Sequence, residues 1–263
     1  MEGAVKGRAL GFLVLLLWGV VKLPVETRIS AEQKATRFGG FKLTSTLRQQ
    51  AGQAGFIAVL GGLRAAVADL LWIRAHVAWQ STQWGKMKLL FDVCTSLQPR
   101  RVMFWDNAAW HMAWNASVYA IEDKAHVPEQ VERYRNQQRY FKLGEDYLLR
   151  GIENNPDSWE LYDRLGWLYK DKLHDKMRAV AAYDEAAKRP GRLDYVRRNG
   201  PYLLADVPGQ EAEAYRRLLA LYHEGEKEWL PTLLKQIQRL ERKLKIPTEQ
   251  RVYIPPEDRL LPD

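Results

Sequence analysis

The side chains that could carry out acid–base chemistry are few and scattered in this 263-residue chain. His111 is the best candidate for proton transfer, and Asp106 precedes it by five residues. On a helix a spacing of five places two side chains on different faces, so we do not expect a catalytic dyad.

Sequence signatures of cofactor and metal sites are also missing. The chain has no glycine-rich phosphate loop, no CxxC pair and no HExxH motif. Cys94 is the single cysteine, which excludes an internal disulfide framework and leaves the redox compartment open. The triplet Asn115-Ala116-Ser117 matches a glycosylation acceptor, but it falls in a predicted helix core and we interpret it as coincidence. We therefore predict no catalytic residue, no cofactor and no metal, and rank a hydrolase or transferase third among the possible functions.

The composition favours a folded binding protein. With 46% apolar residues the chain can form a sizeable core, and its ten tryptophans suit helical cores and binding interfaces. Lys and Arg number 40 against 32 Asp and Glu, a net charge of +8, which suits an anionic neighbour such as a membrane surface. The basic residues are dispersed along the chain, so nucleic acid is a disfavoured partner.

The N-terminus has the charge pattern of a targeting segment. Lys6 and Arg8 precede an uncharged apolar run, 9–21, and Lys22 closes it. No small-x-small cleavage site follows, so we predict an uncleaved signal-anchor over 1–25 rather than a cleaved peptide. The run is apolar on every side, which argues against an ordinary buried helix. The positive N-terminal flank predicts a single-pass protein of the bacterial inner membrane with a periplasmic body.

A linker is predicted over 26–50, where glycine, threonine, serine and charged residues show no sustained apolar period. From residue 51 apolar residues recur at helical spacing and begin a helical body that we place at 51–246. Arg64 and Asp69 interrupt this first helix, so we do not interpret it as a second membrane span.

The helical body contains internal repeats. One set of helix positions recurs after 34 residues and again after a further 57, with small residues at 75, 109 and 166, where closely crossing helices require them. The matched triplets are Leu71, Ala75 and Ala78; Trp105, Ala109 and Met112; and Tyr162, Gly166 and Tyr169. A second set also recurs at 57: Phe91, Cys94 and Pro99 match Leu148, Gly151 and Pro156, and a third copy has Tyr183, Ala186 and Pro190.

This pattern resembles the tetratricopeptide repeat, in which an aromatic, Leu-Gly and Tyr on one helix are followed by Ala, Phe and a closing Pro on the next. The best copy runs from Trp159 to Pro190. The first copy departs from the pattern, because Arg74 replaces Leu and Met87 replaces a small residue. The segment 105–115 is also similar to a stretch of bacterial envelope repeat proteins. The resemblance implies an all-α solenoid of antiparallel helix pairs, membrane-anchored and of the envelope type.

The second repeat is longer than the others. Ala109 and Pro156 are 47 residues apart, against 24 for the equivalent pairs of the first and third repeats, so it has 23 additional residues. The excess predicts a projecting helical hairpin at about 113–147, with its turn near His126-Val127-Pro128. The alternative is a floppy loop, which the helical spacing of 131, 134, 138 and 141 argues against.

Weaker helical segments follow the third repeat. We predict helices over 193–205 and 212–222, and a final helix over 228–245 with leucines on one face and basic residues elsewhere. Such a helix suits the polar end of a solenoid, and a membrane-surface or nucleic-acid role for its charges is the alternative. The proline-containing tail, 247–263, is predicted to be extended.

The resemblance also implies a binding groove, because the first helix of each tetratricopeptide repeat lines the concave face. In this register His76, Trp110 and Trp167 occupy equivalent positions. The alternative is that several of these tryptophans belong to the core. The acidic residues disfavour a clamp for a C-terminal carboxylate. The predicted partner-binding residues are Asp69, Trp72, His76, Trp79, Asp106, Trp110, Trp114, Asp163, Trp167 and Lys170, with Met103, Ala113 and Glu160 also facing inward.

Two functions follow from these features, neither of them enzymatic. The leading hypothesis is a membrane-tethered scaffold or assembly factor that holds a protein or peptide partner in its aromatic groove. The alternative is an accessory subunit of a membrane enzyme or of a machine that handles an envelope polymer.

Overall fold

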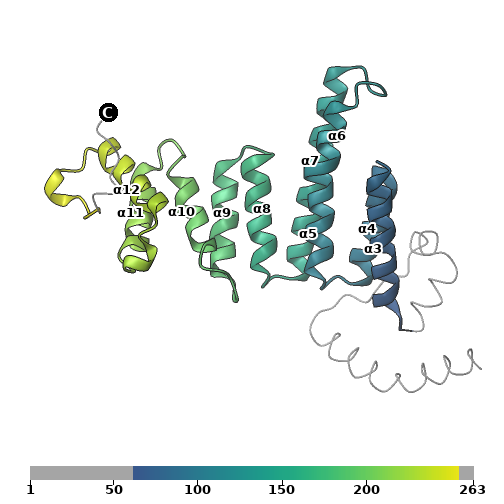
Figure 1. Cartoon of the computed structure of the whole chain (residues 1–263), viewed down its shortest axis with the longest axis horizontal. Coiled ribbons are helices and arrows are strands. Elements are labelled where there is room, and N and C mark those ends of the chain that lie inside the picture. Colours follow the sequence, from purple (N-terminus) through teal and green to yellow (C-terminus); the bar gives the residue numbers. More distant parts are fainter. Residues whose placement is uncertain (1–61, 255–263) are drawn as a thin grey trace, which may run out of the picture. The chain divides into compact units, whose positions relative to one another are not determined.

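The computed structural model describes residues 62–254, and this part of the chain is helical and contains no strand (Figure 1). The predicted all-α class is thereby confirmed. None of the helices in 62–254 is long and apolar enough to cross a membrane. The predicted anchor at 1–25, the linker at 26–50, the start of the helical body and the last nine residues of the tail lie outside the described residues.

The chain divides into two compact units after Pro99. In the first, α3 (Arg64–Gln80) and α4 (Trp84–Leu97) pack on each other. Leu71, Ala75 and Ala78 are buried on α3 at helical spacing. The thiol of Cys94 on α4 donates a hydrogen bond to the Ala68 carbonyl of α3, at 3.3 Å. The small residues therefore lie on the face of α3 that packs on α4, as the repeat pattern predicts.

The second unit is a succession of helices in which each element packs mainly on its neighbours in the chain. Figure 1 shows α7 to α11 side by side in chain order. The elements are α5 (Val102–Trp110), η1 (His111–Ala116), α6 (Ser117–Glu122), α7 (Gln130–Asn154), α8 (Trp159–Asp171), α9 (Lys176–Lys188), α10 (Val196–Leu204), α11 (Glu211–Tyr222), η2 (Glu226–Glu228), α12 (Pro231–Lys243) and η3 (Thr248–Gln250).

Glycines allow the helices of this unit to approach closely. A Cβ atom added to Gly144 would lie 2.6 Å from the Ala113 Cβ, and one added to Gly151 would lie 2.8 Å from the Trp105 Cβ. The two glycines are seven residues apart on α7, so both face the segment formed by α5 and η1. A Cβ atom on Gly166 of α8 would meet the Tyr183 ring of α9 at 2.6 Å. These crossings leave no room for a side chain.

A helical hairpin is formed by residues 102–154. α5, η1 and α6 form one continuous helical segment, and α7 runs back along it. The turn between Glu122 and Gln130 includes the expected 126–128, and the Arg133 guanidinium donates to the carbonyls of Val127 and Pro128, at 2.8 and 2.6 Å. Figure 1 shows α6 and the start of α7 reaching beyond α8 and α9.

The C-terminal helices differ in detail from the sequence expectation. α10 begins at Val196, three residues late, and α12 begins at Pro231 instead of Glu228. Proline suits the first helical position because its missing N–H has no helical partner there, and Glu226–Glu228 form a separate 3-10 turn.

The described part of the tail is not simply extended. It contains the short helix η3, and Ile254 is buried. The Tyr222 hydroxyl donates to the Tyr253 carbonyl at 2.7 Å, and the Val252 N–H donates to the Glu241 carboxylate at 3.0 Å. These bonds fix residues 252–254 to α11 and α12.

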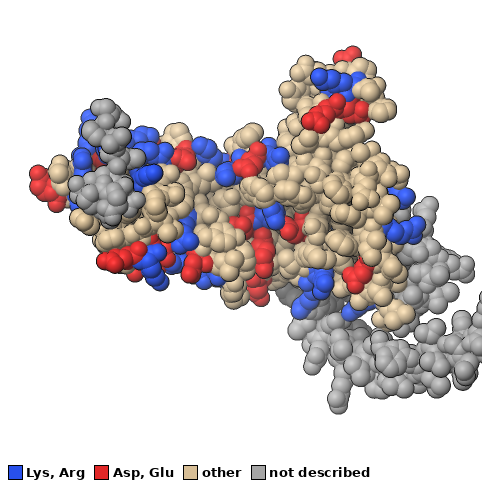
Figure 2. Space-filling view, in the orientation of Figure 1, with Lys and Arg blue, Asp and Glu red and all other residues tan. Residues whose placement is uncertain are grey.

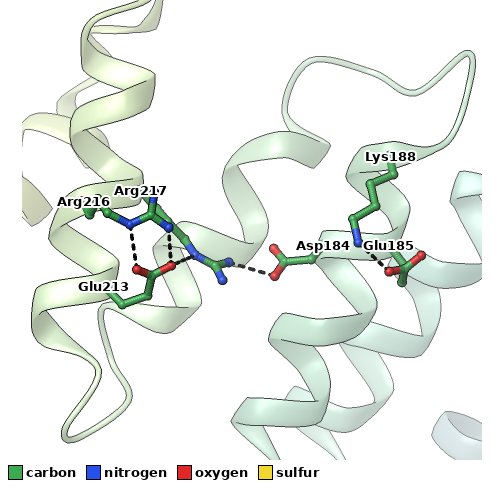
Figure 3. A network of polar contacts seen from close by, with 6 residues as sticks. All are labelled: Asp184, Glu185, Lys188, Glu213, Arg216 and Arg217. Carbon is green, nitrogen blue, oxygen red and sulfur yellow. Dashed lines mark hydrogen bonds and ion pairs between the residues drawn. The ribbon is translucent and has the colours of Figure 1, made fainter.

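An ion pair connects α9 and α11, which are not consecutive helices. The Arg217 guanidinium on α11 binds Asp184 of α9 at 2.8 Å and Glu213 of its own helix at 2.7 Å (Figure 3). Arg216 also binds Glu213, at 2.7 Å, whereas Lys188 pairs separately with Glu185. Hydrogen bonds from Arg216 and then Arg217 lower the pKa of Glu213 to about 2.

Replacing Gly166 with leucine tests the close crossing of α8 and α9. Gly166→Leu is expected to lower the free energy of unfolding by about 1–3 kcal/mol, because even its Cβ would overlap the Tyr183 ring. Chemical denaturation measures this change. Gly85→Ala is the control, since a Cβ atom there meets nothing within 4 Å. An unchanged stability of Gly166→Leu would refute the close packing.

The depressed pKa of Glu213 predicts an acid-dependent stability. A folded-state pKa below the ordinary value of 4.5 stabilises the fold above that pH, and the contribution is lost as pH falls towards about 2. Glu213→Gln should therefore melt at a lower temperature than the wild type at pH 7, and the difference should shrink below pH 4.5. Glu153→Gln is the control because Glu153 is exposed and has no hydrogen bond or ion pair in the described structure. A difference in melting temperature between Glu213→Gln and the wild type that stays constant with pH would contradict the lowered pKa of Glu213.

Candidate functional site

The ten predicted partner-binding residues divide between the two units. Four lie on α3 of the first unit: Asp69, Trp72, His76 and Trp79. Six lie on α5, η1 and α8 of the second: Asp106, Trp110, Trp114, Asp163, Trp167 and Lys170.

On α3 the aromatic residues lie along one side of the helix. The exposed His76 ring lies 6.1 Å from the Trp72 ring and 4.9 Å from the Trp79 ring, between centroids. Both tryptophans are half-buried and Asp69 is exposed. The spacings of four and three residues account for this arrangement, because they bring side chains to one face.

In the second unit three tryptophans form one cluster. The rings of Trp110 and Trp114 stack with their centroids 5.0 Å apart and their planes within 12°. Trp167 from α8 lies 5.4 Å from Trp110 and 4.9 Å from Trp114. All three are half-buried, unlike Trp105, which is 3% exposed and belongs to the core. We call these three residues the tryptophan cluster.

A π-helical turn lies between the two stacked tryptophans. In η1 the helix widens, and His111, Met112, Ala113 and Ala116 are buried while Trp114 remains at the surface. The Nδ1 atom of His111 is 3.0 Å from the Asn115 amide nitrogen, so it pairs with Asn115 and not with Asp106. Asn115 and Ser117, the ends of the possible glycosylation triplet, lie within this helical segment. Single π turns often occur at functional sites.

Two cations lie over the tryptophan cluster, and sequence reasoning missed both. The Arg164 guanidinium is 4.9 Å from the Trp167 ring centroid and 5.5 Å from that of Trp110. It also binds both carboxylate oxygens of Asp106, at 2.6 and 3.2 Å. Lys172 lies 5.5 Å from the Trp114 ring. The available signal was spacing, because Arg164 precedes Trp167 by three residues and therefore shares its helix face.

Asp163 has a different environment from Asp106. It is half-buried and accepts one hydrogen bond, at 2.8 Å, from the Asn199 amide of α10. Burial raises the pKa of the Asp163 carboxyl, and the nearby Asp106 adds to the rise, whereas Asn199 and Arg164 oppose it. Tyr195, 42% exposed, stands edge-on to Trp159 at 6.3 Å.

Lys170 lies apart from the tryptophan cluster. It is exposed and pairs with Asp171 at 3.3 Å, while the Trp167 indole N–H donates to the same aspartate. Of the six predicted residues in this unit, three form the tryptophan cluster, and Asp106 and Asp163 lie beside it. Lys170 is peripheral.

Groups that could support chemistry are sparse in the described residues. Within 62–254 no three His, Cys, Asp or Glu side chains are arranged to hold a metal ion. Burial raises the pKa of the Cys94 thiol to about 12, which keeps it protonated at neutral pH.

The pair formed by Asp106 and Arg164 should contribute measurably to stability, since both side chains are more than two-thirds buried. A double-mutant cycle with Asp106→Ala and Arg164→Ala is expected to give a coupling energy of about 1 kcal/mol. Urea denaturation of the wild type, the two single variants and the double variant measures this coupling energy. Arg192→Ala is the control because Arg192 is exposed and has no interaction in the described structure. Additive effects of Asp106→Ala and Arg164→Ala would show that the pair contributes nothing.

The arrangement places three half-buried aromatic rings beside charged neighbours. On the face seen in Figure 2, basic and acidic side chains are interspersed over much of the second unit. Comparison of the sequence with protein-family models and with curated proteins finds no match.

Proposed function

We propose that the chain is a membrane-tethered scaffold or assembly factor that holds a protein or peptide partner on the tryptophan cluster. The observation that carries the proposal is the stacking of three half-buried tryptophans from two helices. Interface energy concentrates in a few large aromatic and arginine side chains, and here Arg164 adjoins the rings.

Preorganisation supports this function. A binding residue that is already fixed loses little conformational entropy when the partner arrives. Trp110 is held between Trp114, Trp167 and Arg164, and the Asp106 carboxylate fixes the guanidinium. The cluster can therefore offer apolar area at a small entropic cost.

The finer architecture belongs to the same proposal. We interpret the second unit as a tetratricopeptide-like solenoid because α8 and α9 form a helix pair with Gly166 at the crossing, where the repeat pattern requires a small residue. The tether is the apolar run 9–21, and its flanking charges favour the bacterial inner membrane with the body in the periplasm.

A second candidate is an accessory subunit packed permanently on an integral membrane partner. It is favoured by an apolar stripe on α3 formed by Leu70, Ile73 and Val77, which are 63%, 54% and 56% exposed. Their spacing of three and four residues places them along one side of the helix. Contiguous exposed apolar residues mark interaction sites. A stable stoichiometric complex purified from membranes would favour this candidate over a scaffold with exchangeable partners.

Trp110→Ala tests the proposed function. The experiment compares crosslinked partner recovery from native membranes with the thermal stability of the same full-length protein. We expect partner binding to weaken by about 2 kcal/mol or more while the fold remains nearly intact. If Trp110 acted as core, the change would instead cost about 3–5 kcal/mol of stability.

Trp229→Ala is the matched control. Trp229 is also a half-buried tryptophan of the second unit, but it stacks on Tyr222 at 4.8 Å, and its indole N–H donates to the Tyr222 carbonyl at 3.0 Å. The Trp229→Ala protein should be less stable than the wild type and should still bind the partner. A Trp110→Ala protein that unfolds, or that folds and captures every partner at wild-type strength, would remove the tryptophan cluster from the binding site.

A further inference from the structure

Two copies of one side-chain pattern meet at the tryptophan cluster. Asp106 precedes Trp110 by four residues, and Asp163 precedes Trp167 by the same interval. A spacing of four places each aspartate one helical turn from its tryptophan on the same face. The Trp110 and Trp167 rings are 5.4 Å apart, so the two copies lie side by side.

The two aspartates differ in how their charge is balanced. Both oxygens of Asp106 accept hydrogen bonds from Arg164 in a two-point ion pair. Asp163 accepts its one hydrogen bond from Asn199, whose amide is neutral. A carboxylate has about four acceptor positions, so Asp163 retains both its charge and most of its acceptor capacity.

The surroundings of Asp163 favour a cation from outside. The carboxylate is half-buried and its hydrogen-bond donor is a neutral amide, so partial removal from water penalises its ionised form more than that of a carboxylate in a direct ion pair. Arg164 is near enough to influence it, but the guanidinium hydrogen-bonds Asp106. Trp167 on the same face and the exposed Tyr195 close by supply aromatic surface on which a cation can also rest.

An anionic ligand fits this surface less well. An anion that bound Arg164 would have to displace Asp106, which breaks a two-point ion pair between largely buried side chains. It would also approach the unbalanced charge of Asp163. The charges of Asp106 and Asp163 therefore select against an acidic side chain placed beside them.

We propose that the partner is a peptide segment that presents a cationic side chain to Asp163 and an apolar side chain to the tryptophan cluster. This inference rests on the proposed function and specifies the partner. One helical turn separates Asp163 from Trp167, about 6 Å along α8, and two residues of an extended peptide span about 6.6 Å. The expected motif in the peptide is therefore a basic residue and an apolar residue separated by one residue of any type. Arginine suits it better than lysine, because a planar guanidinium can bind the carboxylate at two points and stack on an aromatic ring.

Selection from a display library of random heptapeptides on the full-length protein tests the motif. We expect enrichment of Arg or Lys two positions from an apolar residue. In titrations of a selected peptide against the wild type, replacing its basic residue with citrulline or glutamine should weaken binding about tenfold. The same replacement should have no effect on Asp163→Asn, which removes the charge and keeps the hydrogen-bond acceptor for Asn199.

Asp157→Asn is the matched control, since it makes the same change at an exposed aspartate two residues before α8. It should bind the selected peptides as the wild type does. Peptides that depend on Trp110 but show no basic preference, or an acidic one, would overturn this inference and leave the proposed function standing. A basic preference that survives in Asp163→Asn would also overturn it. If no selected peptide depends on Trp110, both the inference and the proposed function fail.

Discussion

The close approach of α7 to the segment formed by α5 and η1 is the constraint on which the tryptophan cluster depends. A Cβ atom on Gly144 would lie 2.6 Å from Ala113 and 3.2 Å from both the Ala109 carbonyl and Leu168. Ala113 immediately precedes Trp114, and Leu168 immediately follows Trp167. Gly144 therefore lies directly behind the tryptophan cluster, and the missing side chain lets α5, α7 and α8 come near enough for the rings to stack.

The charged residues of the second unit have two different roles. Those at Glu213, Arg217 and Asp184 satisfy one another across α9 and α11, and their benefit is structural. Arg164 is also satisfied within the protein, but its guanidinium lies over two rings and orients them. Asp163 differs from Asp106, because its described hydrogen-bond donor is an uncharged amide.

The repeat spacing predicted much of this arrangement from sequence. Small residues at 109 and 166 identified helix crossings, and the offset of 57 made Trp110 and Trp167 equivalent positions on neighbouring elements. Their contact at 5.4 Å agrees with that register. The sequence also predicts the hairpin turn, because Pro128 and the helical spacing after it mark the boundary between two helices.

Other features had no clear signal in the sequence. The π turn at His111–Ala116 widens the helix without a distinctive composition, and it depends on packing against α7. Arg164 was overlooked because a charged residue between inward positions normally extends into water, whereas here Asp106 on another helix fixes it. The docking of Val252 and Tyr253 depends on the buried Glu241 and on Tyr222, which are far from them in sequence, so local pattern suggested only an extended tail.

The difference between the Asp106–Trp110 and Asp163–Trp167 copies suggests how the tryptophan cluster could select among partners. The Asp106 copy is neutralised by Arg164 of α8, and Asp163 accepts its hydrogen bond from the neutral side chain of Asn199 on α10. If both aspartates were neutralised, the tryptophan cluster would bind apolar segments with little discrimination, because apolar contact carries little directional information. If neither were, two uncompensated acids would repel each other beside the rings. In the function proposed above, the ion-paired Asp106 copy gives rigidity and the Asp163 copy gives a charge that the partner must match, which would divide stability and specificity between two otherwise equivalent positions.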